Sequence, residues 1–177
     1  MRSKEANRYV KYLISLLMVM SVVVEAQVTI VEDFESGVPT TKPSSPTQYT
    51  LKTGSWTFYK SGSGTAHGGS VGVSMSSSSS DPGYVITPVL PTVATMSIWV
   101  KAGGSGKTLT IQKSVDGGAF TTIATPAITS SYSQITLAIN ETSTNVQIKI
   151  MNTPGSGTTE YVDNVTITTL SQSVINV

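Results

Sequence analysis

A short acidic stretch near the start of the chain holds the densest group of side chains able to do chemistry. The stretch VEDFESG places Glu32, Asp33 and Glu35 around one phenylalanine. A second segment near the other end, EYVDNVTIT, contributes Asp163. Paired carboxylates perform general acid–base chemistry when they flank a cleft, and carboxylates with neighbouring carbonyls bind hard cations. These residues therefore pose a choice between catalysis and cation binding.

The remaining side chains do not complete a catalytic site. A serine hydrolase needs a base and an orienting acid, and the one histidine, His67, stands in glycine-rich sequence with no GxSxG motif nearby. Catalytic zinc needs His or Cys ligands, and the chain has no cysteine. We expect His67 to be an ordinary loop residue, because a lone histidine has no partner for either task. The sequence predicts a protein that is not an enzyme.

One glycine-rich motif resembles a phosphate-binding loop without meeting its requirements. The stretch GGSGKT ends at Thr108, but Lys101 stands where the motif needs its first glycine. The segment that follows, LTIQKSV, has the pattern of a strand, whereas phosphate binding needs a helix N-terminus there. A nucleotide site is therefore not expected.

The elements that position the acidic residues are predicted to be strands. Apolar residues alternate with Ser, Thr, Gln and Lys in TMSIWVK, QITLAI and NVQIKIM, which is the pattern of antiparallel strands with one buried face. The stretch DGG between LTIQKSV and AFTTIAT predicts a hairpin. About ten short strands without helices favour an all-β fold, a jelly-roll β-sandwich of two antiparallel sheets. We assign it residues 27–170, with a tail or truncated linker at 171–177.

The first 26 residues have the features of a secretory signal peptide, expected to be helical. A basic start precedes the apolar stretch YLISLLMVMSVVV, which is short for a membrane span, and VEA supplies the small residues of a cleavage site. An uncleaved anchor is the alternative. The expected location of the mature chain is secreted, extracellular or at the cell surface, and the lack of cysteine favours a bacterial setting.

Removal of residues 1–26 changes the charge of the chain. Both arginines lie in this segment, and the mature chain keeps seven lysines and eight acidic residues, a net charge of −1. A chain without arginine is a poor candidate for nucleic-acid binding, which relies on clusters of cationic side chains. No nucleic-acid partner is therefore expected, and no membrane partner after signal cleavage.

Side-chain alternation in YVDNVTI places Asp163 on the same face as Val165 and Ile167, directed into the core. A carboxylate there is costly unless it is paired or bound to a cation. Calcium suits the site because it takes six to eight oxygen ligands, including carbonyls. If the first and last strands are neighbours, Glu35 and a carbonyl beside Asp33 lie close enough to contribute. A solvated acidic loop is the alternative.

An ordered set of segments resembles a known family. DFESG, AHGGSVGV, MSIWVKA and YVDNVTI follow one another as in the jelly-roll carbohydrate-binding modules of secreted bacterial polysaccharide-degrading proteins and in related adhesion-type sandwiches. This resemblance covers most of Gln27–Thr169. It implies that Glu35 and Asp163 are side-chain ligands of a structural calcium ion, and that carbonyls around Asp33 and Ser70 complete its shell. The second Asp of the family's usual YIDDV string is Asn164 here.

Candidate glycan-binding residues lie on the faces that the alternation directs away from the core. Flat aromatic rings beside planar polar groups suit sugars. The candidates on these faces are Trp99, Tyr132, Gln134, Lys101 and Gln147, and Trp56 and Tyr84 are further aromatic candidates. Two alternatives stay open: Trp99 packs under a loop, and Trp56 serves the core, since large aromatic rings are usually well buried.

The leading prediction is a secreted, non-catalytic carbohydrate-binding module with a structural calcium site. Its partner would be a polysaccharide or a cell-surface glycan, and the chain is expected to be a monomer. It would act as an accessory module of a glycoside hydrolase or polysaccharide lyase. The alternative is a structural or adhesive cell-surface β-sandwich domain without a glycan site, and a third reading is an enzyme, a lyase or hydrolase of small sandwich type. Exposure of Trp99 and Tyr132 in a groove would favour the first, and coverage of both would favour the second.

Overall fold

The computed structural model describes residues 27–169. The predicted signal peptide and the predicted tail therefore lie outside the described residues. Within the described part every regular element is a strand, and no helix there is long and apolar enough to span a membrane. The prediction of an all-β chain is confirmed.

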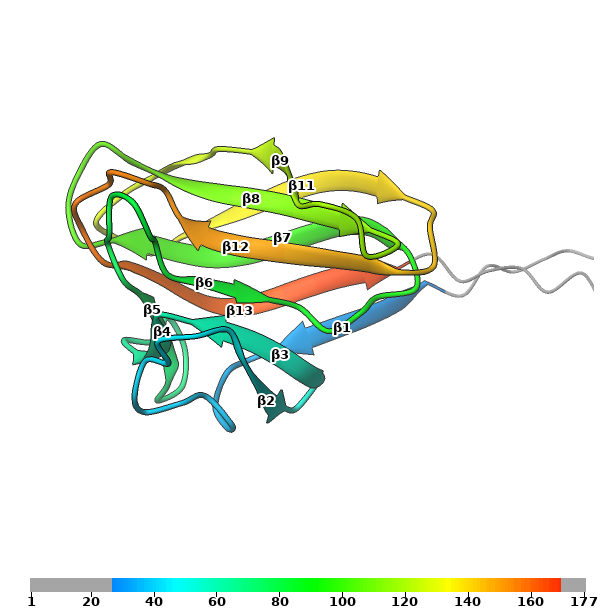
Figure 1. Ribbon diagram of the computed structural model, residues 1–177, viewed down its shortest axis with the longest axis horizontal. Helices are drawn as coiled ribbons and strands as arrows, with labels where there is room; N and C mark the ends of the chain where they lie inside the picture. The colour runs from blue at the N-terminus through cyan, green and yellow to red at the C-terminus, as the bar shows by residue number, and fades with distance from the viewer. Residues whose placement is uncertain (1–26, 170–177) are drawn as a thin grey trace, which may run out of the picture. The chain divides into compact units, whose positions relative to one another are not determined.

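The strands form two antiparallel sheets, which Figure 1 shows running along the long axis of the sandwich. The six-stranded sheet consists, in spatial order, of β11 (Ser133–Glu141), β7 (Val93–Ala102), β13 (Glu160–Thr169), β5 (Gly72–Met75) and β4 (Ser61–Gly64), with β1 (Val28–Glu32) also paired to β13. The seven-stranded sheet consists of β10 (Ala127–Ile128), β8 (Lys107–Val115), β12 (Val146–Asn152), β6 (Tyr84–Ile86), β3 (Gly54–Tyr59) and β2 (Thr47–Leu51), with β9 (Thr121–Ala124) also paired to β8.

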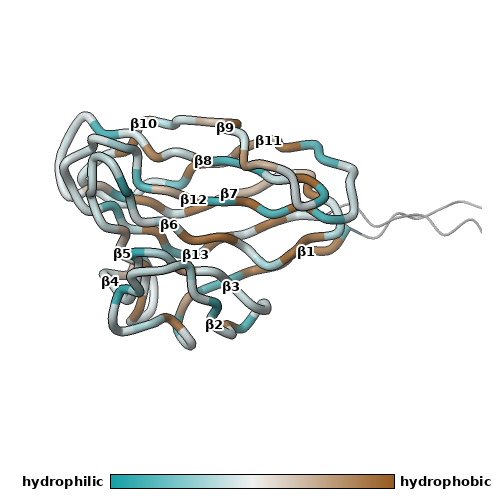
Figure 2. Tube along the Cα trace, viewed as in Figure 1, coloured by the Kyte–Doolittle hydropathy of each residue, from teal (hydrophilic) through white to brown (hydrophobic). Residues whose placement is uncertain are grey.

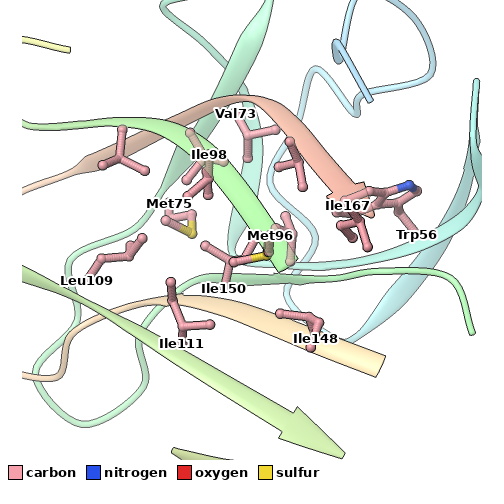
Figure 3. Close-up of a cluster of buried hydrophobic side chains, with 14 of the residues drawn as sticks. Trp56, Val73, Met75, Met96, Ile98, Leu109, Ile111, Ile148, Ile150 and Ile167 are labelled. Carbon is pink, nitrogen blue, oxygen red and sulfur yellow. The ribbon is translucent and has the colours of Figure 1, made fainter. Parts of the chain in front are cut away.

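The alternation of side chains produces the core between the sheets. Along β12, Val146, Ile148 and Ile150 are fully buried while the residues between them are partly exposed. The same alternation is visible as changing hydropathy along the strands in Figure 2. Met96 and Ile98 of β7 face the same interior from the other sheet, as Figure 3 shows. One apolar face per strand thus becomes one continuous core.

Two expectations about connections are confirmed. The first and last strands are neighbours, since β1 pairs with β13 from Val28↔Thr169 to Glu32↔Val165. The DGG stretch forms a tight hairpin between β8 and β9, in which Gly118 N–H donates to Val115 O at 2.9 Å. Asp116 and Gly117 both have positive φ, 52° and 73°, as a type I′ turn requires.

The predicted direction of the Asp163 side chain is wrong because β13 contains a bulge. Pairing with β7 runs Asp163↔Trp99 and then Thr166↔Ser97, so β13 carries one extra residue there. Asn164 occupies this irregularity with φ of 46°. The extra residue reverses the alternation: Asp163 shares the outer face with Trp99, whereas Val165 faces the core.

Candidate functional site

The three carboxylates of the acidic stretch have three separate partners. Glu32 is 1% exposed, and its carboxylate accepts hydrogen bonds from Phe34 N–H at 3.1 Å and from Thr53 N–H and Oγ1 at 3.0 and 2.6 Å. The Thr53 hydroxyl in turn accepts the indole N–H of Trp56 at 2.9 Å. Glu32 therefore fixes the turn between β2 and β3 from inside the sandwich.

Asp33 and Glu35 point away from that buried site. Asp33 forms an ion pair with Lys52 at 2.7 Å, which lowers the pKa of the carboxyl group. Glu35 accepts the N–H of Ser70 at 3.0 Å on both oxygens, and the N–H of Val71 at 3.3 Å. Thus Glu35 anchors one end of the segment at residues 65–71, hereafter the 65–71 loop.

The opposite side of the 65–71 loop is held by Asp163. Its carboxylate is fully buried and accepts the N–H groups of His67 at 2.8 Å, Gly68 at 3.1 Å and Asn164 at 2.8 Å. The loop crosses the outer face of the six-stranded sheet and buries Asp163 there. The carboxylate is satisfied by amide donors from the loop and from its own bulge.

These contacts define how the predicted calcium ligands are placed. Glu35, Asp163 and Ser70 come together at the 65–71 loop, and Asp33 lies apart in its pair with Lys52. Amide N–H groups, not carbonyl oxygens, contact the two loop-facing carboxylates. Within residues 27–169, no group of three or more His, Cys, Asp or Glu could hold a metal ion. This donor set does not fit an ion held between Glu35 and Asp163 unless the loop amides withdraw.

The 65–71 loop also covers the tryptophan predicted to bind sugars. The imidazole of His67 stacks on the indole of Trp99, with ring centroids 3.7 Å apart and planes 10° from parallel. Tyr132 stands edge-on to the same imidazole at 5.5 Å and donates its hydroxyl to Thr65 O. Burial, with the Asp163 charge adding to it, raises the pKa of the Tyr132 hydroxyl. Trp99 and Tyr132 lie together, but a loop occupies the ring surface a sugar would need.

The other candidates on this face are polar. Lys101 Nζ lies 4.9 Å from the ring centroids of both Tyr132 and Tyr161. Gln134 is exposed and its amide reaches Ser97 Oγ at 3.5 Å. Tyr161, which sequence reasoning missed, faces Lys101 across the β13–β7 pair. The ammonium group is held between two rings beside the covered tryptophan.

Trp56 is not available to a ligand. It is 1% exposed and packs edge-to-face on Phe34, with centroids 5.3 Å apart. Figure 3 shows the ring beside Ile167 among the buried side chains. The expectation of a binding role for Trp56 is corrected in favour of the open alternative, a core residue, because its position in β3 alternates inward.

A second aromatic cluster lies on the outer face of the seven-stranded sheet. Tyr59 and Tyr84 are cross-strand partners on β3 and β6, with ring centroids 5.0 Å apart and an angle of 38° between planes. Both rings are partly exposed. The Tyr59 hydroxyl donates to Asp81 at 2.6 Å, which also pairs with Lys60. The pair forms a two-ring surface beside β12.

Lys149 extends this surface across β12. Its Nζ lies 4.9 Å from the Tyr84 ring and 4.0 Å from the Phe120 ring, which the β8–β9 connection brings over the sheet. Gln112 stands directly opposite Lys149 on β8. We call Tyr59, Tyr84, Phe120, Lys149, Gln112 and Gln147 the aromatic platform. Gln147 belongs to it by alternation with Lys149 along β12, and its amide donates to Thr87 O at 3.2 Å.

The predicted ligand-binding residues thus separate onto two sheets. Tyr84 and Gln147 lie on the aromatic platform, while Trp99 and Tyr132 lie under or beside the 65–71 loop. Sequence reasoning missed Phe120, whose place depends on a hairpin, and it missed the contact of His67 with Trp99, 32 positions apart in the chain. The DGG turn was the signal that could have brought Phe120 back over β8.

One buried acid belongs to neither cluster. Glu160, at the start of β13, has no exposed surface, and burial raises its pKa to about 8. The Thr153 amide and Lys107 favour the charged form, yet among the described residues no donor reaches either carboxylate oxygen with hydrogen-bonding geometry. Burial therefore favours the protonated form of this side chain.

Comparison with known proteins identifies relatives by fold. No family of known sequences and no curated protein matches the chain. A cleaved adhesin domain of Lys-gingipain from Porphyromonas gingivalis matches with a TM-score of 0.56 and 19% identity, over 81% of this chain and 99% of that one. The CBM22-1 xylan-binding domain of Paenibacillus barcinonensis Xyn10C matches with a TM-score of 0.54 and 13% identity, over 85% and 99%.

A third structure is a variant of the family 29 carbohydrate-binding module CBM29-2 in complex with mannohexaose. It matches with a TM-score of 0.55 and 11% identity, over 81% of this chain and 92% of that one. At these identities the likeness concerns the fold. The chain therefore has the jelly-roll β-sandwich fold that carbohydrate-binding modules and cleaved adhesin domains share.

Proposed function

We propose that the protein is a non-catalytic carbohydrate-binding domain that receives its glycan on the aromatic platform. The observation that carries this proposal is the Tyr59–Tyr84 ring pair, partly exposed on the outer face of the seven-stranded sheet. Apolar ring surface beside a few polar groups is the composition of small-ligand sites. Gln112 and Lys149 supply hydrogen-bonding groups next to these rings.

The structural neighbours support this function without assigning the ligand. One is described as a xylan-binding domain, and another was solved with mannohexaose. Both are binding modules, in agreement with the expectation that this chain is not an enzyme. Because the Tyr59–Tyr84 pair is partly exposed and Trp99 is covered by His67, we propose the glycan site on the seven-stranded sheet and not at Trp99.

The test is retention on a panel of soluble and insoluble polysaccharides. We expect at least one polymer to retain the protein, and Tyr84→Ala to weaken that binding about tenfold, the effect of losing a well-packed aromatic contact. Thr136→Ala, on the exposed outer face of β11, serves as the control and should bind like the parent. Retention that survives Tyr84→Ala, Tyr59→Ala and Lys149→Gln together would place the glycan elsewhere.

A structural or adhesive domain without a glycan site is the second candidate. The stack of His67 on Trp99 favours it, because the largest ring on the six-stranded sheet packs against its own chain. The likeness to a cleaved adhesin domain agrees with it. Lack of retention on every polysaccharide, with a correctly folded protein, would decide for this function.

The structural calcium ion remains a prediction within this proposal. The calcium site is supported by the fact that Glu35 and Asp163 both contact the 65–71 loop. The loop amides that donate to these carboxylates would compete with a calcium ion for the same oxygens. Melting the protein in calcium and in chelator separates the two arrangements. A melting temperature several degrees higher in calcium supports the ion, whereas equal temperatures assign the loop to hydrogen bonds alone.

Secretion is also part of the proposal, supported by the basic and apolar pattern of the first 26 residues. The mass of protein recovered from the culture medium tests it. We expect a chain that begins at Gln27. Retention of the protein in the membrane fraction at full mass would instead support an uncleaved anchor.

A further inference from the structure

Lys149 lies against two aromatic rings of the aromatic platform, as Lys101 lies against two rings on the other sheet. Its ammonium group lies against the Phe120 and Tyr84 rings, at 4.0 and 4.9 Å from their centroids. Its sheet neighbours on either side are Ile86 and Gln112, which carry no charge. The side chain is partly buried, and this burial lowers its pKa. Partial burial thus leaves this cation less well solvated than it would be on an open surface.

Among residues 27–169, no carboxylate forms an ion pair with this cation. Within residues 27–169, the lysines in ion pairs are Lys52, Lys60 and Lys113. Lys149 has no carboxylate partner and donates no hydrogen bond in the described part of the chain. The ring contacts are attractive but occupy none of its three N–H donors in a charge-assisted bond.

The carboxylate that contacts the Tyr59 end of the aromatic platform is already paired with a lysine. Asp81 accepts from Lys60 and from the Tyr59 hydroxyl, and the Lys60 contact comes first among the causes that lower its pKa. The negative charge of Asp81 is therefore balanced by Lys60, beside Tyr59. Lys149 remains as the uncompensated charge among the platform residues, next to the rings on which a sugar would stack.

We propose that the glycan bound by the aromatic platform is anionic, with an acidic group of a sugar residue paired to the Lys149 ammonium. This inference rests on the proposed function and adds the ligand class to it. A uronic acid offers the required chemistry: a ring whose apolar face lies on Tyr84 and a carboxylate that accepts a charge-assisted hydrogen bond from the Lys149 ammonium. A neutral sugar would leave the desolvated charge without a counterion. Bonds to a charged partner are shorter and roughly twice as strong as neutral ones.

The experiment compares polymers that differ in charge alone. Affinity of the full chain is measured by calorimetry for polygalacturonate and for the same polymer after carboxyl reduction, for alginate and carboxyl-reduced alginate, and for dextran sulfate and dextran. We expect the acidic member of at least one uronate pair to bind about tenfold or more tightly than its neutral form. Added salt should weaken this binding, because it screens the partly exposed pair.

Variants locate the effect at Lys149. Lys149→Gln should remove the preference for the acidic polymer, and Lys149→Arg should keep most of it. Lys52→Gln removes the same charge at the turn between β2 and β3, where Lys52 pairs with Asp33 and not with a platform residue, and should bind like the parent. Melting temperatures of all three variants confirm that each is folded.

The outcomes are distinguishable. If a neutral polymer binds as tightly as its acidic form, or more tightly, the anionic inference is overturned and carbohydrate binding stands. If every polyanion binds equally and Lys52→Gln weakens binding as much as Lys149→Gln, attraction is general and the Lys149 site is rejected. If no polymer of either kind binds, the proposed function fails and this inference fails with it. A sulfate preference that Lys149→Gln abolishes supports the anionic class with sulfate in place of carboxylate.

Discussion

The imidazole of His67 lies flat on the indole of Trp99, with centroids 3.7 Å apart. The amide of the same histidine donates to the buried carboxylate of Asp163 at 2.8 Å. Asp163 and Trp99 are direct cross-strand partners. One residue of the 65–71 loop thus seals two neighbouring positions of the six-stranded sheet, by its ring and by its backbone.

Removal of this ring should open the indole to solvent. For His67→Ala we expect a loss of about 1 kcal/mol in unfolding free energy, the usual value of an aromatic contact. Quenching of tryptophan fluorescence by acrylamide should rise, and the change reports on Trp99 because Trp56 is 1% exposed. His67→Phe keeps a flat ring and should restore low quenching. Equal quenching of the parent and His67→Ala would contradict the stacked arrangement.

The loop anchor at Asp163 should be more important for stability than the anchor at Glu35. Asp163→Asn keeps one acceptor oxygen and places an amide NH2 donor where the other oxygen accepted, so it faces either the N–H groups of His67 and Gly68 or that of Asn164 in a fully buried site. We expect a loss of about 2–3 kcal/mol, measured by urea unfolding. Glu35→Gln, at an exposed position, is the matched control and should cost under about 1 kcal/mol. Equal losses for the two variants would show that burial of Asp163 is not decisive.

Glu160 should make the fold less stable in alkali. Burial raises its pKa from 4.5 to about 8, so the folded state holds a proton that the unfolded state releases between these values. Stability therefore falls as pH rises through this window, by up to about 1.4 kcal/mol per pH unit, and the loss is complete above the folded pKa. Glu160→Gln should melt at a nearly constant temperature from pH 5 to 9. A parent protein with the same flat profile would exclude the raised pKa.

Glu141 should act in the opposite direction at low pH. Lys113 donates to it at 2.8 Å and links β8 of one sheet to β11 of the other. This bond, with donors from Ser143, lowers the pKa of Glu141 to about 2. The stabilisation is complete above pH 4.5 and is lost as pH falls toward 2. Glu141→Gln should cost about 1 kcal/mol at pH 7. The difference from the parent, followed by thermal melting, should vanish near pH 2; a constant difference would argue against the ion pair.

Much of the fold could be predicted because alternation is a local property of the sequence. The apolar positions of β7 and β12 identify the core side of each strand without knowledge of its partners. The DGG hairpin followed from turn chemistry alone. The pairing of β1 with β13 was a topological expectation, and it is correct.

The errors have a common cause in long-range contacts. The bulge at Asn164 changes side-chain parity, and it directs Asp163 toward the 65–71 loop, about a hundred residues away in the chain. The sequence alone therefore gave the right burial for Asp163 and the wrong face. His67 was considered without partners because its partners come from β7 and β13. Trp56 shares its face with Phe58 and Trp99 shares its face with Ser97 and Lys101, so alternation along each strand separates the core ring from the outer one. The loop that covers Trp99 could be recognised only in the assembled structure.

The pairing of Val28 with Thr169 brings the two ends of the described domain to one place on its surface. A domain whose two ends lie close together can be inserted into a loop of a host protein without distorting the domain or the host. The same proximity allows a short linker to join the ends, with new termini opened at the exposed DGG hairpin. Because the first and last strands must meet before the 65–71 loop gains both of its anchors, that loop is expected to order late in folding, at the cost of closing almost the whole chain.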